Sequence, residues 1–221
     1  MTEAVLLITE DDAFRDEYDY LKRFVSSDKR ARLERFHFFA DAQRSLLGEL
    51  LARVLICERA GLNNAQLVFG VNPYGKPVLE NDRHIHFNVS HSGGYVVCAI
   101  DDVPVGVDVE GINKDNTELA KRFFAPDEID YIVQASTEEQ MVRFCRIWTQ
   151  KESCIKREGM GLSKSLSSFS VLKGEEEGLF YHLVFHNHEA VCHICSEKRA
   201  LPVCKILDKV DFLARAHVLR V

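Results

Sequence analysis

Two acidic residues alternate within one short segment and could hold a metal ion. In Val105-Gly-Val-Asp-Val-Glu110, the valines share one face of an extended strand, and Asp108 and Glu110 share the other. The two carboxylates would lie about 7 Å apart along the strand. Like charges this close need a positive partner, and Mg²⁺ prefers oxygen ligands and keeps water molecules for a substrate phosphate. The alternative interpretation is an edge strand whose polar face is solvated.

A helical segment further along the chain could complete this site. Trp148, Glu152 and Lys156 recur at a spacing of four residues and share one helix face. Glu152 could supply a third carboxylate, and Lys156 would reach the anion that the metal holds. The alternative is an ordinary Glu–Lys pair on a solvated helix, which is worth about 0.2–0.5 kcal/mol.

Ser90 and His91 end a predicted strand beside a Gly-Gly turn. Because adjacent strand residues point to opposite faces, the two side chains do not suit a nucleophilic Ser–His dyad. Contacts to a ligand, or a structural turn, explain them better. Further candidates for anion binding are separated basic residues, each of which could also be a solvated surface charge: Lys29, Arg32, Arg44 and Lys76. Arg44, near a helix start, could bind an anion together with the helix dipole.

The elements that position these residues follow from hydrophobic periodicity. Helices are predicted from Asp41, as N-cap, to a stop at Gly61, from about residue 125, and from about 140 to 158 before Gly159-Met-Gly161. Strands are predicted at 4–9, at 86–91, 95–100 and 105–110 as an antiparallel meander, and near 168–172, 179–185, 190–194 and 203–207. Each half thus offers a long helix followed by strands. This pattern fits an α+β fold of two similar subdomains that meet near residues 104–115.

Length, charge and cysteine content narrow the class of protein. A chain of 221 residues suits one large domain or two small ones. The net charge of −6 argues against a non-specific nucleic-acid binder, which needs a basic surface. No run of about 20 apolar residues predicts a membrane span, and the first residues do not resemble a secretory signal. Seven scattered cysteines favour reduced thiols in a cytoplasmic protein.

A cluster of histidine and cysteine residues near the end of the chain could be read as a zinc site. Its members are His186, His188, Cys192 and Cys195. Structural zinc needs four Cys or His ligands at ordered spacing. The alternation around Cys192 favours a strand instead, with Cys192 and Cys195 on opposite faces.

Several motifs occur together and in order, and in this combination the chain resembles the 4′-phosphopantetheinyl transferases of the Sfp type. The motifs are Asp41-Ala-Gln-Arg-Ser-Leu-Leu-Gly48, Tyr74-Gly-Lys-Pro77, Phe87-Asn-Val-Ser-His-Ser92, Val105-Gly-Val-Asp-Val-Glu110, Phe123-Phe-Ala-Pro-Asp-Glu128, Trp148-Thr-Gln-Lys-Glu152 and Gly159-Met-Gly-Leu162. The resemblance covers roughly residues 20–172. It implies two similar α+β subdomains around a pseudo-twofold axis, each with an antiparallel sheet and a long helix, and coenzyme A in the cleft between them.

The resemblance also implies an activity and a site. The phosphopantetheine arm of coenzyme A would pass to a serine of an apo acyl or peptidyl carrier protein, and adenosine 3′,5′-bisphosphate would leave. Mg²⁺, or Mn²⁺, would be held by Asp108, Glu110 and Glu152. The pyrophosphate would contact His91 and Lys156. Contacts to the 3′-phosphate and adenosine would come from Lys29, Arg32, Arg44, Lys76 and Ser90.

The two subdomains would divide this work. Residues 1–104 would form the side that binds adenosine and the 3′-phosphate, and residues 105–221 the side that binds the metal and the pyrophosphate. Catalysis would rest on charge neutralisation by the metal, Lys156 and His91. Glu152 would accept the serine proton, directly or through a water. Glu128 is a secondary acidic candidate, and Lys151 could tune the site or pair elsewhere.

Carrier proteins of this family are acidic, so docking would need a local basic surface. Lys114, Lys121 and Arg122 around Phe123 and Phe124 could provide it, unless the two phenylalanines belong to the core. We expect a monomer that binds neither nucleic acid nor membrane. Two alternative functions stay open: a non-catalytic module that binds coenzyme A or a carrier protein, and another Mg²⁺-dependent phosphotransferase or pyrophosphatase.

Overall fold

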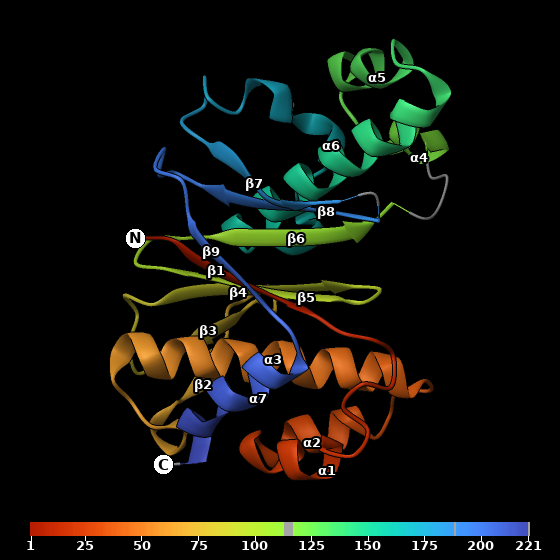
Figure 1. Cartoon of the computed structure of the whole chain (residues 1–221). Helices are drawn as coiled ribbons and strands as arrows, with labels where there is room; N and C mark the ends of the chain where they lie inside the picture. The colour runs from red at the N-terminus through yellow and green to blue at the C-terminus, as the bar shows by residue number, and fades with distance from the viewer. Residues whose placement is uncertain (113–116, 188, 221) are drawn as a thin grey trace.

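The protein consists of two sheets packed face to face between two long helices (Figure 1). The computed structural model describes residues 1–112, 117–187 and 189–220. The first sheet has the order β4(His86–Ser92)-β5(Tyr95–Asp101)-β1(Glu3–Ile8)-β9(Val203–Leu207), and the second has the order β6(Gly106–Gly111)-β8(Ala190–Ser196)-β7(Phe180–His186). Helix α3(Phe39–Ala60) covers the first sheet and α6(Thr137–Glu158) covers the second.

The two halves repeat one topology. In the first, β1 is followed by α3 and the hairpin β4–β5, and β1 pairs antiparallel with β5; in the second, β6 is followed by α6 and the hairpin β7–β8, and β6 pairs antiparallel with β8. Both helices have 22 residues and end at a left-handed glycine, Gly61 and Gly159, a backbone conformation that glycine adopts without strain. The predicted α+β fold of two similar subdomains is confirmed.

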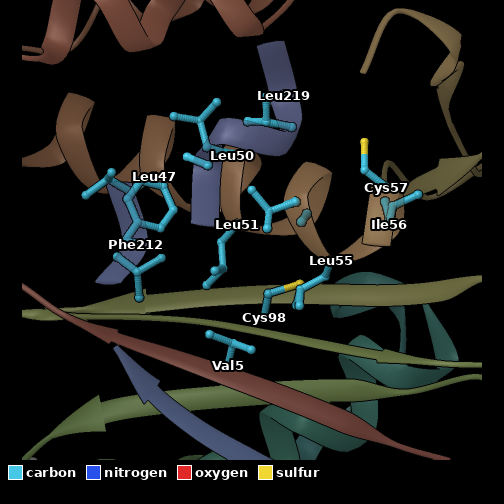
Figure 2. Close-up of a cluster of buried hydrophobic side chains, with 14 of the residues drawn as sticks. Val5, Leu47, Leu50, Leu51, Leu55, Ile56, Cys57, Cys98, Phe212 and Leu219 are labelled. Atoms are coloured by element: carbon cyan, nitrogen blue, oxygen red, sulfur yellow. The ribbon is translucent and has the colours of Figure 1, made fainter. Parts of the chain in front are cut away.

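The last part of the chain returns to the first sheet. Strand β9 pairs with β1, and this pairing is parallel, unlike the antiparallel ladders around it. Helix α7(Lys209–Arg215) and the 3₁₀ segment Ala216–Arg220 follow β9, and Phe212 of the helix and Leu219 of the 3₁₀ segment join the leucines of α3 in the core (Figure 2). Residues from 203 onward therefore complete the core of the first half, although the predicted division assigns them to residues 105–221.

Strand alternation explains how the sheets pack. The predicted apolar face, formed by Val107 and Val109 of β6 and by Val105 just before the strand, is fully buried among residues of β8 and of the first sheet. On β1, Val5 and Leu7 point to α3, while Leu6 points to the second sheet. One face of each sheet thus contacts a long helix and the other face contacts the opposite sheet.

Two short helices complete each half around the long helix, and the first half also has a short hairpin. They are α1(Tyr18–Leu21), α2(Ser27–Leu33) and β2(Phe69–Val71) with β3(Pro77–Leu79) in the first half, and α4(Thr117–Phe123) and α5(Pro126–Val133) in the second. Although α3 and α6 are long, neither they nor any other helix in the described residues is apolar enough to cross a lipid bilayer.

Three sequence-based expectations about elements are wrong. Strand β6 does not continue the meander, because both edges of β5 are occupied by β4 and β1, so β6 pairs with β8. Asp41 is not the N-cap of α3 but lies in its first turn, where it accepts a hydrogen bond from Arg44. Residues 168–172 form no strand but lie in short 3₁₀ turns, since the buried side chains of Lys151 and Glu128 bind backbone groups of this segment, as described below.

Candidate active site

Polar side chains of β4 join the two halves at their facing edges. Asn88, Ser90 and Ser92 lie on the face of β4 that is turned away from α3, and each accepts a hydrogen bond from a backbone N–H of β6. The pairs are Asn88 with Val107 at 2.9 Å, Ser90 with Val109 at 3.5 Å, and Ser92 with Gly111 at 3.4 Å. This contact places the acidic face of β6 directly against β4.

The acidic face of β6 is held by hydroxyl groups of β4. Ser90 Oγ donates to Asp108 Oδ1 at 2.8 Å, and Ser92 Oγ donates to Glu110 Oε2 at 3.0 Å. Asp108 is only 2% exposed, and its second oxygen, Oδ2, is buried without a hydrogen-bond partner. A buried, unpaired carboxylate oxygen is costly, so this atom points to a ligand.

Glu152 of α6 belongs to the same group of carboxylates. Helix α6 comes very close to β6, because a Cβ at Gly106 would lie 1.9 Å from the carbonyl oxygen of Ser153. Burial, and then the charge of Asp108, raises the pKa of Glu152, whereas Lys156 opposes the shift. Burial and then Asp108 also raise the pKa of Glu110. The structure thus brings the three predicted metal-binding carboxylates within electrostatic reach of one another.

The donor set of this site suits a hard cation. Within residues 1–112, 117–187 and 189–220, no three His, Cys, Asp or Glu side chains are already arranged around a common point that would hold a metal ion. The positive charge beside Asp108 is instead Lys156, whose Nζ is hydrogen-bonded to Asp108 Oδ1 and, at 2.9 Å, to Ser90 Oγ. Oδ2 of Asp108 has no hydrogen-bond partner, and the charge of Asp108 adds to burial in raising the pKa values of Glu110 and Glu152; a divalent cation would relieve this repulsion.

A large cavity opens beside these carboxylates. Its volume of about 970 Å³ is of the size that binds small-molecule ligands. The walls come from α2, α3, the β2–β3 hairpin, β4 and the end of α6. They include five residues with predicted contacts to coenzyme A: Lys29, Arg32, Ser90, His91 and Lys156.

The pKa values of two basic residues that line the cavity, Lys29 and His91, are lowered. Burial lowers the pKa of Lys29, although its ammonium lies 3.5 Å from Glu49 and donates to Ser45. At the rim, desolvation and then the charges of Arg44 and Lys156 lower the pKa of His91. Burial is the main cause of both shifts; at His91 the positive charges of Arg44 and Lys156 add to it, and a bound anion would offset them.

Arg44 and Lys76 are not among the described residues that line this cavity. The guanidinium of Arg44 contacts Asp11, Asp41 and the carbonyl oxygen of Gly93. Lys76 Nζ donates to the carbonyl oxygens of Val105 and Arg157, each at 3.2 Å, and burial lowers its pKa to about 8. In this state Lys76 connects the β2–β3 turn to the starting point of β6 and the end of α6.

Glu128 and Lys151 form a fully buried ion pair with a separation of 2.7 Å. Lys151 Nζ also donates to the carbonyl oxygens of Leu166 and Phe169, and the oxygens of Glu128 accept hydrogen bonds from the backbone of Ala125 and Val171. This pair fastens α5 and the segment after α6 to α6 itself. Because its oxygens are buried and occupied, Glu128 is not placed to accept a substrate proton.

The surface predicted to dock a carrier protein is described only in part. Phe124 is buried in the core beside Phe144, and Phe123 packs partly against the same cluster. Lys121 is exposed and pairs with Glu118, and Arg122 lies over the ring of Phe123. Lys114 lies outside the described residues.

The cysteine and histidine cluster is part of the second sheet. Cys192 faces the first sheet, whereas Cys195 lies on the opposite face of β8 beside Cys154 of α6. His186 ends β7, and His188 lies outside the described residues. The prediction that this segment is a strand is confirmed.

Ser92 is the residue of this site that the sequence analysis missed. Its spacing of two residues from Ser90 places both hydroxyls on one face of β4 and was visible in the sequence. That this face meets the carboxylates of β6 follows only from the contact between the two strands.

Comparisons with known proteins agree with this geometry. The model of the 4′-phosphopantetheinyl transferase N-terminal family matches residues 12–102, and that of the 4′-phosphopantetheinyl transferase superfamily matches residues 104–205. The 4′-phosphopantetheinyl transferase psf-1 of Bacillus pumilus is 43% identical over 178 residues, which are 80% of this chain and 76% of that protein.

Two other relatives extend the comparison. The 4′-phosphopantetheinyl transferase Sfp of Bacillus subtilis (strain 168) is 40% identical over 157 residues, with 71% of this chain and 70% of Sfp covered. The 4′-phosphopantetheinyl transferase gsp of Aneurinibacillus migulanus is 35% identical over 181 residues, with 82% and 76% covered. Together with the family models, these similarities show that the chain belongs to the 4′-phosphopantetheinyl transferase superfamily, among the enzymes of Sfp type.

Proposed function

We propose that this enzyme transfers the 4′-phosphopantetheine group of coenzyme A to a serine of an apo carrier protein and releases adenosine 3′,5′-bisphosphate. The observation that carries the proposal is the place of Lys156. Its ammonium contacts Asp108 and Ser90 while the side chain also lines the large cavity. A phosphate bound there would contact a basic wall and lie beside carboxylates that could hold a cation, and phosphoryl transfer depends on such positioning and neutralisation of charge.

We assign the adenosine and 3′-phosphate end of coenzyme A to residues 1–104 and the reacting pyrophosphate to residues 105–221 together with His91. Lys29 and Arg32 line the cavity on the first side, and Lys156 lines it on the second. Arg44 and Lys76 would join them by exchanging their present partners for the ligand's phosphates. One chain supplies both walls, so we also propose that the enzyme acts as a monomer.

A divalent cation, Mg²⁺ or Mn²⁺, would be held by Asp108, Glu110 and Glu152 and would neutralise charge on the phosphate oxygens. Lys156 and His91 would bind the pyrophosphate and stabilise the negative charge that develops on the leaving adenosine 3′,5′-bisphosphate. Lys156 has one ammonium hydrogen left for this contact after its bonds to Asp108 and Ser90.

Glu152 would act as the base. As the serine oxygen forms its bond to phosphorus and the pyrophosphate bond breaks, the hydroxyl proton would pass to the carboxylate of Glu152, directly or through a water. Burial and the neighbouring Asp108 raise the pKa of Glu152, which makes its carboxylate a better proton acceptor.

The test is to incubate the enzyme with coenzyme A, Mg²⁺ and several apo carrier proteins, and to measure the mass of each carrier. A gain of one phosphopantetheine group is expected. Glu110→Ala should abolish this gain while circular dichroism shows an intact fold. If no carrier gains mass, the enzyme is not a transferase for these carriers. Cleavage of coenzyme A without transfer would favour a pyrophosphatase, and binding without cleavage a non-catalytic module.

A further inference from the structure

We propose that Ser92 is a positioning residue for the reaction, because its hydroxyl fixes the carboxylate of Glu110 in the orientation that binds the divalent cation. This inference rests on the proposed metal-dependent function. Ser92 itself would contact neither the cation nor coenzyme A.

The hydrogen bonds of Ser92 define the direction of its hydroxyl group. Ser92 Oγ accepts from the N–H of Gly111 at 3.4 Å, and it lies 3.0 Å from Glu110 Oε2. A carboxylate only accepts hydrogen bonds, so the hydroxyl hydrogen points to Oε2. One oxygen of Glu110 is therefore occupied, and Oε1 is left for a ligand.

The backbone around Ser92 is held firmly in place. Ser92 ends β4 at a tight turn in which Gly93 has a φ of 53°. A Cβ at Gly94 would lie 2.5 Å from the carbonyl oxygen of Thr9, and the N–H of Thr9 donates to the carbonyl oxygen of Gly94 at 2.8 Å. The segment before α1 thus fixes the hairpin end, and with it the hydroxyl.

The neighbouring pair repeats this arrangement. Ser90 donates to Asp108 Oδ1 and accepts from the N–H of Val109, two residues before the equivalent contacts of Ser92. In that pair the second oxygen, Oδ2 of Asp108, is buried and has no partner. Strand β4 therefore presents two hydroxyls in register with two carboxylates, each of which is bound through one oxygen.

Such contacts matter because a carboxylate that already has one oxygen fixed loses less rotational freedom when a cation binds the other. Removal of a group that orients a metal ligand typically weakens metal binding by about 10–100-fold. Weakening the hydrogen-bonded seam between β4 and β6, formed by Asn88, Ser90 and Ser92, would not by itself reduce metal affinity in this way. This difference allows a test.

Three variants separate positioning from structural support. Ser92→Ala removes the hydroxyl, and Ser92→Thr retains it. Asn88→Ala is the matched control, because Asn88 lies on the same face of β4 and accepts from the N–H of Val107 but contacts no carboxylate in the described part of the chain. Each variant is titrated with Mn²⁺ in the presence of coenzyme A and without carrier protein, and free Mn²⁺ is measured by electron paramagnetic resonance.

Ser92→Ala should raise the Kd of Mn²⁺ at least about tenfold. Ser92→Thr should restore it to near the wild-type value, and Asn88→Ala should lower the Tm without changing this Kd. An unchanged Kd in Ser92→Ala, or an equal increase in Asn88→Ala, would refute the positioning role of Ser92 but would leave the proposed metal site standing. If the wild-type enzyme bound no Mn²⁺, the proposed metal site would fail together with this inference.

Discussion

Lys156 is the residue that links the carboxylates, Asp108 buried and Glu110 and Glu152 half-buried, to the large cavity. In the free enzyme its ammonium compensates the negative charge of Asp108. Burial nevertheless raises the pKa of Asp108. The same side chain lines the cavity. A cation at Asp108 would replace this compensation, and the ammonium could then turn fully to the pyrophosphate. Binding of the metal and of coenzyme A should therefore favour each other.

The pKa of His91 leads to a prediction about the pH dependence of coenzyme binding. In the free enzyme, desolvation and nearby cations hold this pKa below 6.5. A bound pyrophosphate would raise it, so binding takes up a proton, and affinity should fall as pH rises through the interval between the two values. Calorimetry in buffers of different ionisation enthalpy measures this uptake.

The ligand for that experiment is dephospho-coenzyme A, since a 3′-phosphate has its own pKa of about 6. His91→Gln serves as the control, because glutamine keeps a hydrogen-bond donor but does not titrate. The proton uptake should disappear in this variant. Equal uptake by His91→Gln and the wild-type enzyme would show that another group titrates.

The ion pair of Glu128 and Lys151 leads to a prediction about stability. Glu128→Gln would leave a buried ammonium without its carboxylate, and breaking a buried pair in this way costs about 3–5 kcal/mol. The free energy of unfolding from urea titration measures the loss. Glu118→Gln is the matched control, because Glu118 pairs with Lys121 on an exposed surface and little change is expected there. Similar losses in both variants would contradict this account.

At the scale of elements, the approach of α6 to β6 positions Glu152. Gly106→Ala should destabilise the enzyme by about 1–3 kcal/mol and weaken Mn²⁺ binding, because the new Cβ would collide with backbone atoms of Ser153 and Arg157 and displace the helix. Thermal unfolding and the Mn²⁺ titration measure the two effects. In Gly70→Ala, the three atoms nearest to the new Cβ all belong to the flexible side chain of Glu80, which can move away, so a much smaller loss of stability is expected. Unchanged Mn²⁺ binding in a destabilised Gly106→Ala would show that Glu152 does not depend on this contact.

The elements also show what the sequence could predict. Alternation identified the buried valines of β6 and the shared face of Asp108 and Glu110, because side-chain direction is a local property of a strand. It could not identify β8 as the partner of β6, since pairing depends on which strand edges remain free in the folded chain. The prediction of a strand at 168–172 is wrong because the side chains that bind the backbone of this segment, Glu128 and Lys151, lie far away in sequence.

The site was predictable to a similar extent. Residue types and spacing singled out Asp108, Glu110, Glu152 and Lys156, but each only as a candidate. The role proposed for Ser92 depends on the contact between β4 and β6, which joins two different sheets. The hydrogen bonds from Arg44 to Asp11 and from Lys76 to the carbonyl oxygen of Val105 likewise depend on tertiary contacts.

At the scale of the whole molecule, the site depends on both halves staying together, because the first half supplies the described walls of the cavity except Lys156, and the second half supplies Lys156 and the carboxylates. The seam between β4 and β6 and the core between the sheets connect the two halves, and β9 and α7 return from the second to the first. These connections cross the predicted boundary at residues 104–105 in both directions. We therefore expect the two halves to unfold as one cooperative unit.

Phe212→Ala tests this expectation from the far end of the chain. Phe212 is fully buried beneath α3 with its ring 5.6 Å from that of Phe14, so the substitution should cost about 3–5 kcal/mol. Val210→Ala on the same helix changes an exposed side chain and should have little effect. The single tryptophan, Trp148, lies in α6 of the second half, so its fluorescence reports that half, while far-UV circular dichroism reports the whole chain. Because the halves are coupled, both signals should move to lower urea concentration together in Phe212→Ala; a fluorescence transition that stayed at its wild-type midpoint would show that the second half unfolds independently.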